Sequence, residues 1–257
     1  MIHVAAQTKG GVGKTTLSNH VLPFLTDAAL VIEIDNNNIS SIYTASEKIK
    51  GITLQTNQKS LEQAIIEAEL SSLDGNIIID AGGGDDSIKV IEALMAAKLD
   101  CTVWLPITPD QEILLNAKEL VSKIGKTYPI NLVFSRFSNL KDDFYFIFGD
   151  ETQAPNLQFL APFAHVLQIP MKNIFSKAKQ RSTTVWDLAT IFGEIDPQDL
   201  KRSWQNEYAN AADKVSAKEL YIQRRAILWL QDEATEYLNA VKNSFQSTKD
   251  FIKNIQS

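Results

Sequence analysis

Short runs of β-branched and aliphatic residues alternate with longer amphipathic stretches over about the first 190 residues. This alternation is typical of repeated strand-helix-strand units around a parallel sheet. The predicted strands are Ile2–Gln7, Leu30–Asp35, Ile77–Asp80, Thr102–Pro106, Asn131–Ser135 and Leu157–Ala161. The predicted helices are Thr15–Thr26, Ser60–Leu73, Asp86–Lys98 and Gln111–Thr127. Because the first four strands are apolar on both faces, we expect them at the centre of an α/β three-layer sandwich with a mostly parallel sheet.

The pattern changes near Pro197, where strand signals stop and apolar residues recur at helical spacing. We therefore predict a main domain over residues 1–196 and a helical extension over residues 197–257, packed on the same domain. A long homodimeric coiled coil is the alternative, although it would place Arg224 and Gln231 on its apolar seam.

Composition narrows the classes of protein to consider. The 257 residues include 31 acidic and 25 basic side chains, for a net charge of −6. Such a chain does not coat nucleic acid by bulk charge, although a local basic patch is still compatible with it. The single cysteine, Cys101, excludes an internal disulfide and all-cysteine metal sites. No run approaches the roughly 20 apolar residues of a membrane span, and the first residues lack an export signal, so we expect a cytoplasmic protein.

A glycine-rich segment joins the first predicted strand to the first predicted helix. It reads Lys9-Gly10-Gly11-Val12-Gly13-Lys14-Thr15-Thr16. Glycines let successive backbone amides turn toward phosphate oxygens, and the following helix directs its positive dipole end at the same anion. Lys14 then reaches the β- and γ-phosphates, while the Thr15 hydroxyl is placed to ligate Mg²⁺. The residues predicted to bind nucleotide here are Gly10, Gly11, Val12, Gly13, Lys14, Thr15 and Thr16.

A second lysine, Lys9, precedes the phosphate-loop lysine by five residues. This arrangement resembles the deviant Walker A motif of the ParA/MinD family of ATPases, and most closely the ParA partition ATPases. The resemblance implies a P-loop NTPase fold of the SIMIBI type, ATP and Mg²⁺ as cofactors, and a homodimer that forms on ATP binding. It also implies that Lys9 crosses the dimer interface to the partner's nucleotide, where a cation neutralises charge on the transferred phosphoryl group.

Two aspartates extend the resemblance. The segment Glu33-Ile34-Asp35-Asn36-Asn37 occupies the place of the family's Asp-x-Asp-Pro-Gln switch. Asp35 matches its second aspartate, which implies that Asp35 acts with Lys9 and Lys14 in catalysis by orienting the attacking water. Asp80 ends a buried strand as the Walker B aspartate does, which implies a Mg²⁺ site shared with Thr15. Three glycines, at 82–84, replace the family's proline-containing turn and favour a mobile loop.

The resemblance also implies where the base binds. Ser135 and Arg136 follow a predicted strand at the family's adenine-contacting position, with Ser135 in place of the frequent asparagine. Pro170 and Met171 match the family's Ile-Pro loop, which walls the base.

A basic cluster follows that loop and comprises Lys172, Lys177, Lys179 and Arg181. In ParA-like proteins this region contributes to nonspecific DNA binding by the dimer, and neutralising phosphates gives a sequence-independent affinity. The resemblance therefore implies nonspecific DNA as a partner, plasmid or DNA partition as the role, and a ParB-like centromere-binding protein that stimulates hydrolysis. The ATP-bound protein would be associated with the nucleoid. A solvated helix face is the alternative interpretation of the cluster.

Two other functions stay open. A MinD-like membrane switch would use an amphipathic C-terminal helix, for which Val241, Phe245 and Ile252 offer only a thin apolar face, so we expect no stable membrane association. A nucleotide-clamped adaptor would bind ATP with little turnover. Iron–sulfur and zinc-binding relatives with a similar loop are excluded because they need several cysteines.

Overall fold

One twisted sheet forms the centre of the protein. The computed structural model describes residues 1–34, 46–54 and 58–256. The sheet has the strand order β3-β2-β4-β1-β5-β6-β7-β8, and every neighbouring pair is parallel except β7 and β8. The strands are β1 (Ile2–Ala5), β2 (Leu30–Ile34), β3 (Lys50–Leu54), β4 (Ile77–Ala81), β5 (Cys101–Ile107), β6 (Ile130–Phe137), β7 (His165–Pro170) and β8 (Gln246–Ser247).

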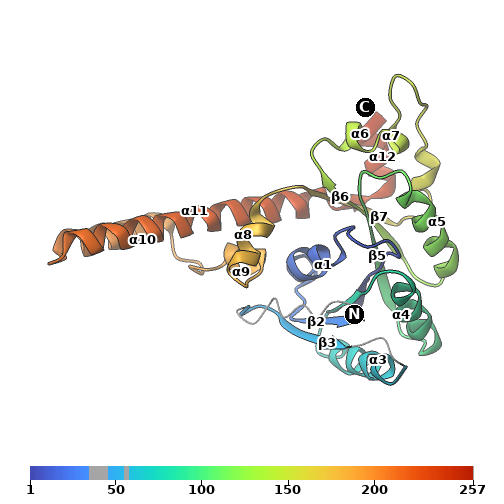
Figure 1. The fold of residues 1–257 in the computed structure, drawn as a ribbon, viewed down its shortest axis with the longest axis horizontal. Helices are drawn as coiled ribbons and strands as arrows, with labels where there is room; N and C mark the ends of the chain where they lie inside the picture. Colours follow the sequence, from blue (N-terminus) through green and yellow to red (C-terminus); the bar gives the residue numbers. More distant parts are fainter. Residues whose placement is uncertain (35–45, 55–57, 257) are drawn as a thin grey trace.

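Helices cover both faces of this sheet (Figure 1). One face carries α3 (Gln58–Ser72), α4 (Asp85–Ala96), α5 (Ile113–Ile124), α6 (Leu140–Asp143), α7 (Tyr145–Phe148), the 3₁₀ turn η2 (Leu157–Leu160) and α12 (Thr248–Gln256). The other carries α1 (Lys14–Thr16), the π-helical segment η1 (Leu17–Val21), α2 (Leu22–Thr26), α8 (Ile174–Gln180), α9 (Val185–Ala189) and α11 (Lys214–Ser244). Helix α10 (Pro197–Asn210) packs on α11.

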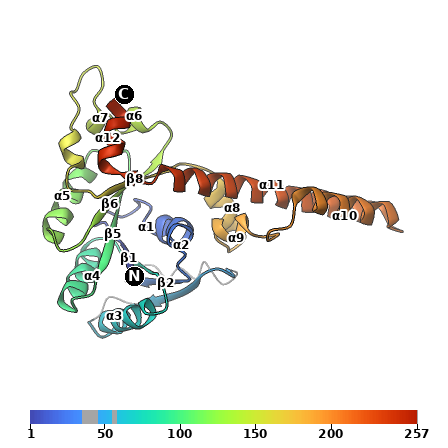
Figure 2. The same cartoon turned by 180° about the vertical axis from the view of Figure 1, so that it is seen from behind.

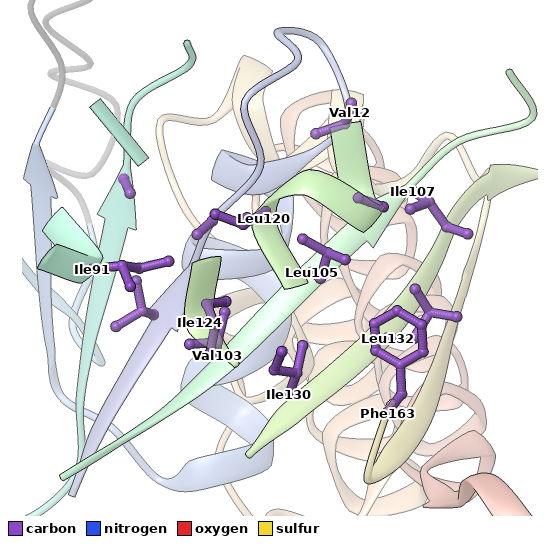
Figure 3. Packing of buried hydrophobic residues seen from close by; sticks show 14 of the residues in the cluster. Val12, Ile91, Val103, Leu105, Ile107, Leu120, Ile124, Ile130, Leu132 and Phe163 are labelled. Atoms are coloured by element: carbon purple, nitrogen blue, oxygen red, sulfur yellow. The ribbon is translucent and has the colours of Figure 1, made fainter. Parts of the chain in front are cut away.

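Successive side chains of the central strands enter the hydrophobic cores on opposite faces of the sheet. On β5, Val103 and Leu105 enter the core beneath α4 and α5 (Figure 3), whereas Trp104 between them enters the core beneath α11. Successive side chains of a strand point to opposite faces, so a strand covered on both sides must be apolar throughout. The predicted three-layer α/β sandwich is confirmed, and β1, β4 and β5 lie at its centre as expected.

The sheet departs from prediction at several places, one of which is the short strand β8, where the sequence predicted only helix. The predicted strand Leu157–Ala161 is wrong, because these residues form the turn η2, whose Phe159 and Leu160 are buried in the core. The last parallel strand is β7, a few residues later. The edge strand β3 was not predicted, since its sequence Lys50-Gly51-Ile52-Thr53-Leu54 is largely exposed and lacks a continuous apolar run.

Part of the C-terminal helical region packs on the sheet, and part of it extends away from the sheet. The second half of α11 packs on the sheet side through Ala234, Leu238 and Val241, which are buried. Its first half extends away from the sheet with α10 alongside it, as both views show (Figures 1 and 2). The chain then returns through β8 to α12, whose Phe251 stacks on Phe134 at 5.7 Å between ring centroids. The division into residues 1–196 and 197–257 stays a prediction.

None of the described helices combines the length and the apolar character needed to cross a membrane.

Candidate phosphate-binding site

The glycine-rich segment forms a loop at the carboxyl end of β1. Gly11 has φ +74° and Gly13 has φ +92°, values that residues with a Cβ rarely adopt. The loop and the neighbouring strand ends enclose a cavity of about 340 Å³. It is lined by Gly10, Gly11, Gly13, Lys14, Thr15, Thr16, Glu33, Asp80, Ala81, Gly82, Gly83 and Arg136. Most of the predicted loop residues thus share one cavity, while Val12 is buried beneath it.

Lys14 is one of the residues that line this cavity. It is the first residue of α1, and the residue is only 9% exposed. Its Nζ donates a hydrogen bond to the Lys9 carbonyl oxygen at 3.4 Å. An anion that enters the cavity therefore meets this cation in a poorly solvated setting.

Asp80 supplies an unsatisfied buried carboxylate beside it. Its Oδ1 has no hydrogen-bond partner among the described residues. Burial raises the pKa of Asp80 to about 7; the Thr15 hydroxyl and the Lys14 cation oppose the rise, and the Glu33 carboxylate adds to it. A buried carboxylate oxygen next to a hydroxyl is a donor set that suits Mg²⁺, which prefers oxygen ligands and keeps most of its waters. Asp80 and Thr15 therefore fit the predicted metal site.

Glu33 is a further residue of the cavity that the sequence prediction did not include. It is buried, stands opposite Asp80 in the β2–β4 register, and accepts a hydrogen bond from the Thr53 hydroxyl at 3.3 Å. A charged residue within an otherwise apolar buried strand is the signal that could have identified it, since acidic residues are rarely buried unless they are paired or bind a metal ion.

Lys9 forms an ion pair within its own chain. Its Nζ contacts Asp110 and lies 3.6 Å from Glu112 Oε2, both in the segment that leads from β5 to α5. The hydrogen bond from Lys9 lowers the pKa of Asp110, and the same bond raises the pKa of Lys9. The sequence prediction did not identify Asp110 or Glu112, because their pairing with Lys9 spans more than 100 positions.

Ser135 and Arg136 occupy an irregular point in β6. The register with β7 shifts between Ser135 and Phe137, and Arg136 has φ +58°. The irregularity re-aims Arg136, which lines the cavity. Ser135 instead is buried, and its hydroxyl donates to the carbonyl oxygen of Val12 at 2.8 Å. The hydroxyl that we expected to face a base thus braces the phosphate loop.

Two other predicted site residues, Pro170 and Met171, are not among the residues that line the cavity. Pro170 ends β7, and its carbonyl oxygen accepts a hydrogen bond from the Tyr237 hydroxyl at 2.9 Å. Met171 is 62% exposed, and its amide donates a hydrogen bond to the Phe137 carbonyl oxygen. Asp35 lies outside the described residues. The roles of these residues in binding the base and in catalysis stay predictions.

The four predicted DNA-binding residues lie on or beside α8. Lys172, Lys179 and Arg181 are exposed, whereas Lys177 pairs with Glu233 of α11 at 2.5 Å. Residues two apart on a helix differ by about 200° in direction, so Lys177 and Lys179 face different sides. The structure therefore divides the cluster rather than presenting four free cations on one face.

Two solved structures share this architecture. McdA from Cyanothece, in its apo form, superposes with a TM-score of 0.50 at 13% sequence identity, over 73% of this chain and 92% of McdA. The MinD cell division protein of Aquifex aeolicus gives a TM-score of 0.51 at 12% identity, over 72% and 89% of the two chains. Neither a model of a protein family nor a curated protein matches the sequence. The likeness concerns the fold, and the chain has the three-layer P-loop NTPase fold of these proteins.

Proposed function

We propose that this protein is a Mg²⁺-dependent ATPase of the ParA/MinD family. The observation that carries the proposal is the cavity in which Lys14, the loop glycines and an unsatisfied oxygen of Asp80 converge. A buried cation and a ring of backbone amides bind the phosphates, and the Asp80–Thr15 pair accepts the metal. The fold shared with McdA and MinD agrees with this assignment.

We assign the residues of the site separate roles in binding phosphate, in binding Mg²⁺ and in orienting water. Lys14 binds the terminal phosphates, and Arg136 adds positive charge on the side of Gly13. Asp80 and Thr15 hold Mg²⁺, which bridges phosphate oxygens and neutralises their charge when it is bound. Asp35 orients the attacking water, and Glu33 adds a second buried carboxylate beside Asp80.

We further propose that two ATP-bound chains form a homodimer through Lys9. Because Lys9 is paired with Asp110 and Glu112 in its own chain, it must leave them to reach a partner's nucleotide. The dimer would bring two copies of the exposed cations Lys179 and Arg181 to DNA. We place this nonspecific DNA binding in plasmid or DNA partition, with a ParB-like partner that stimulates hydrolysis in the cytoplasm and on the nucleoid.

The membrane-switch alternative receives no support from α12. The apolar side of this helix is part of the core: Phe251 is 1% exposed, and Ile252 and Ile255 pack against the buried cluster. Binding a bilayer through it would require breaking that packing, which costs about 25 cal/mol for each Å² of apolar surface exposed.

The decisive experiment measures assembly and DNA retention with ADP and with ATP. We expect the wild-type protein to elute as a dimer and to retain DNA with ATP·Mg²⁺ only. Lys14→Ala should lose nucleotide binding, whereas Lys9→Ala should bind nucleotide as a monomer. Lys118→Ala removes an exposed lysine of α5 and serves as the control. ATP-independent DNA binding, or binding to liposomes in place of DNA, contradicts the proposed partition role.

A further inference from the structure

The part of α11 that extends away from the sheet carries a row of exposed apolar side chains. Val215, Ile222 and Trp229 are 70%, 55% and 62% exposed and follow one another at a spacing of seven residues. Ala226, between the last two, is also exposed. At about 100° per residue, these four positions lie within about 60° of one another around the helix axis. They form one continuous row, which we call the α11 stripe.

The other sides of α11 are covered within the chain. Helix α10 packs on the side opposite the stripe, where Arg224 pairs with Glu207 and lies over the Trp204 ring at 5.8 Å. The sheet side is covered through the buried residues Leu230 and Ala234. Single exposed apolar residues are ordinary on a protein surface, but a row at seven-residue spacing is typical of a face that packs on another helix.

Charged residues follow one edge of the stripe in two blocks of opposite sign. Lys218 and Arg225 come first along this edge, and Asp232 and Glu236 continue it toward the C-terminal end of the helix. Within the described part of the chain, these four residues form no ion pair, although Arg225 lies over the Trp229 ring at 5.4 Å. The edge is therefore positive in its first half and negative in its second half.

We propose that the α11 stripe is a self-association surface, on which α11 of a second copy of this chain packs in the antiparallel direction. In an antiparallel pair, the same edge of each helix meets its counterpart running the opposite way. Lys218 and Arg225 of each copy then lie opposite Glu236 and Asp232 of the other. In a parallel pair this edge would lie against the other edge of the stripe, so the two blocks could not meet.

The two-fold axis of this pair passes close to Ala226. Beside that position, a groove of about 300 Å³ runs between α8 and α11 and is bordered by Ala226, Trp229 and Leu230. The groove gives the apolar side chains of the second helix room to pack against the stripe. The surface is thus self-complementary in its apolar row, its charges and its shape.

The contact is separate from the nucleotide site, because no residue of the stripe lines the phosphate-binding cavity. Residues 215–236 span about 33 Å of helix, which makes a small interface. We therefore expect weak association, with a dissociation constant on the order of 10–100 µM. Dilute protein stays monomeric through this surface, so the ATP-dependent dimer proposed above is a different assembly.

The first test is sedimentation equilibrium without nucleotide, over protein concentrations that bracket this constant. The wild-type mass should rise from monomer to dimer, and Ile222→Glu should weaken the association at least about tenfold. Leu115→Glu, at a 70% exposed position of α5, is the matched control and should behave as wild type. Lys9→Ala should also associate as wild type does, so a failure of the ATP-dependent dimer does not affect this result.

A monomeric wild-type protein at every concentration overturns the inference. The same protein is then mixed with vesicles of anionic phospholipid. Vesicle binding that Ile222→Glu abolishes, in a chain that does not self-associate, would assign the stripe to a membrane and likewise overturn the inference.

The second test determines the direction of packing. Cys101 is the only cysteine and is buried, so an introduced thiol reports its own contacts. Under mild oxidation of concentrated protein, Ala226→Cys should form an intermolecular disulfide because it lies near the two-fold axis. Val215→Cys should not, since its two copies would be more than about 30 Å apart. Disulfides at both positions, or at neither, overturn the antiparallel arrangement.

A charge exchange tests the same arrangement without cysteines. Lys218→Glu and Glu236→Lys should each weaken the association, because each places like charges opposite one another. The double variant restores the pairs with reversed sign and should recover the wild-type dissociation constant to within about twofold. A double variant that associates no better than the single variants overturns the proposed pairing.

Discussion

Lys9, at the start of the phosphate loop, and Asp110, between β5 and α5, form an ion pair within a single chain. Both side chains are about one third exposed, at 32% and 39%, and Glu112 stands nearby at 3.6 Å. The cation proposed to act on a second subunit is thus occupied by acids of its own. In the proposed dimer Lys9 would exchange this pair for a contact with the partner's nucleotide, so the pair would oppose assembly.

Replacing Asp110 should promote that assembly. In Asp110→Asn, Lys9 loses its main partner, so less free energy is needed to release it. An exposed ion pair is weak, so we expect the ATP-dependent dimerisation constant to rise by up to about fivefold. Sedimentation equilibrium at several protein concentrations measures this constant.

The control for Asp110→Asn is Glu119→Gln, which breaks the exposed pair with Lys123 at 3.3 Å on α5. It should leave dimerisation unchanged. If Asp110→Asn dimerises no better than wild type in ATP, the pair with Lys9 does not restrain assembly.

Ser135 should matter for the phosphate loop rather than for the base. Its hydroxyl donates to Val12 in the loop, and the carbonyl oxygen of Ile107 lies 3.1 Å away. Ser135→Ala leaves the buried Val12 carbonyl without its partner, which costs about 1–3 kcal/mol in unfolding free energy. Urea denaturation measures the loss, and Ser138→Ala, at an exposed position, is the control. If Ser135→Ala is as stable as wild type but discriminates less well between ATP and GTP, Ser135 contacts the base instead.

His20 should make folding sensitive to mild acid. Its Nδ1 accepts a hydrogen bond from the Val185 amide at 3.2 Å, and burial lowers its pKa to about 4. An unfolded chain protonates its histidines near pH 6.5, so the unfolded state takes up this proton first as the pH falls. The contribution of His20 is complete above about pH 6.5 and is lost progressively toward pH 4, by on the order of 3 kcal/mol in total.

The measurement for His20 is the free energy of unfolding from pH 7 to pH 4, in wild type and in His20→Gln. Glutamine keeps a neutral acceptor for Val185 and does not titrate, so the variant should show a shallower decline. His3 also has a pKa lowered to about 4 by burial, so part of the slope remains in the variant. Identical slopes for the two proteins would exclude His20 as a source.

The sequence predicted those features that local patterns encode. Strands buried on both faces must be apolar throughout, so β1, β4 and β5 were recognisable, and the phosphate loop is defined by contiguous residues. Apolar content alone led to a wrong strand prediction at Phe159 and Leu160, which are buried in the core but belong to a 3₁₀ turn. Pairings between distant segments, such as Lys9 with Asp110, have no local signal.

The basic cluster gives the last prediction, because the structure separates its members. Lys177 is neutralised by Glu233 at 2.5 Å, while Lys179 and Arg181 are exposed. A cation already paired releases few counterions on DNA, so Lys179→Ala and Arg181→Ala should weaken DNA binding more than Lys177→Ala does. Each of the first two should also reduce the slope of log K against log salt by about 1.

Fluorescence anisotropy with a duplex of arbitrary sequence, in ATP and at several salt concentrations, measures both quantities. Lys118→Ala on α5 should bind as wild type does. Glu233→Gln completes the comparison, because it frees Lys177 and should strengthen binding if α8 contacts the duplex. Equal effects of the three α8 substitutions would mean that the Lys177–Glu233 pair opens on DNA, and no effect from any of them would place the DNA-binding surface elsewhere.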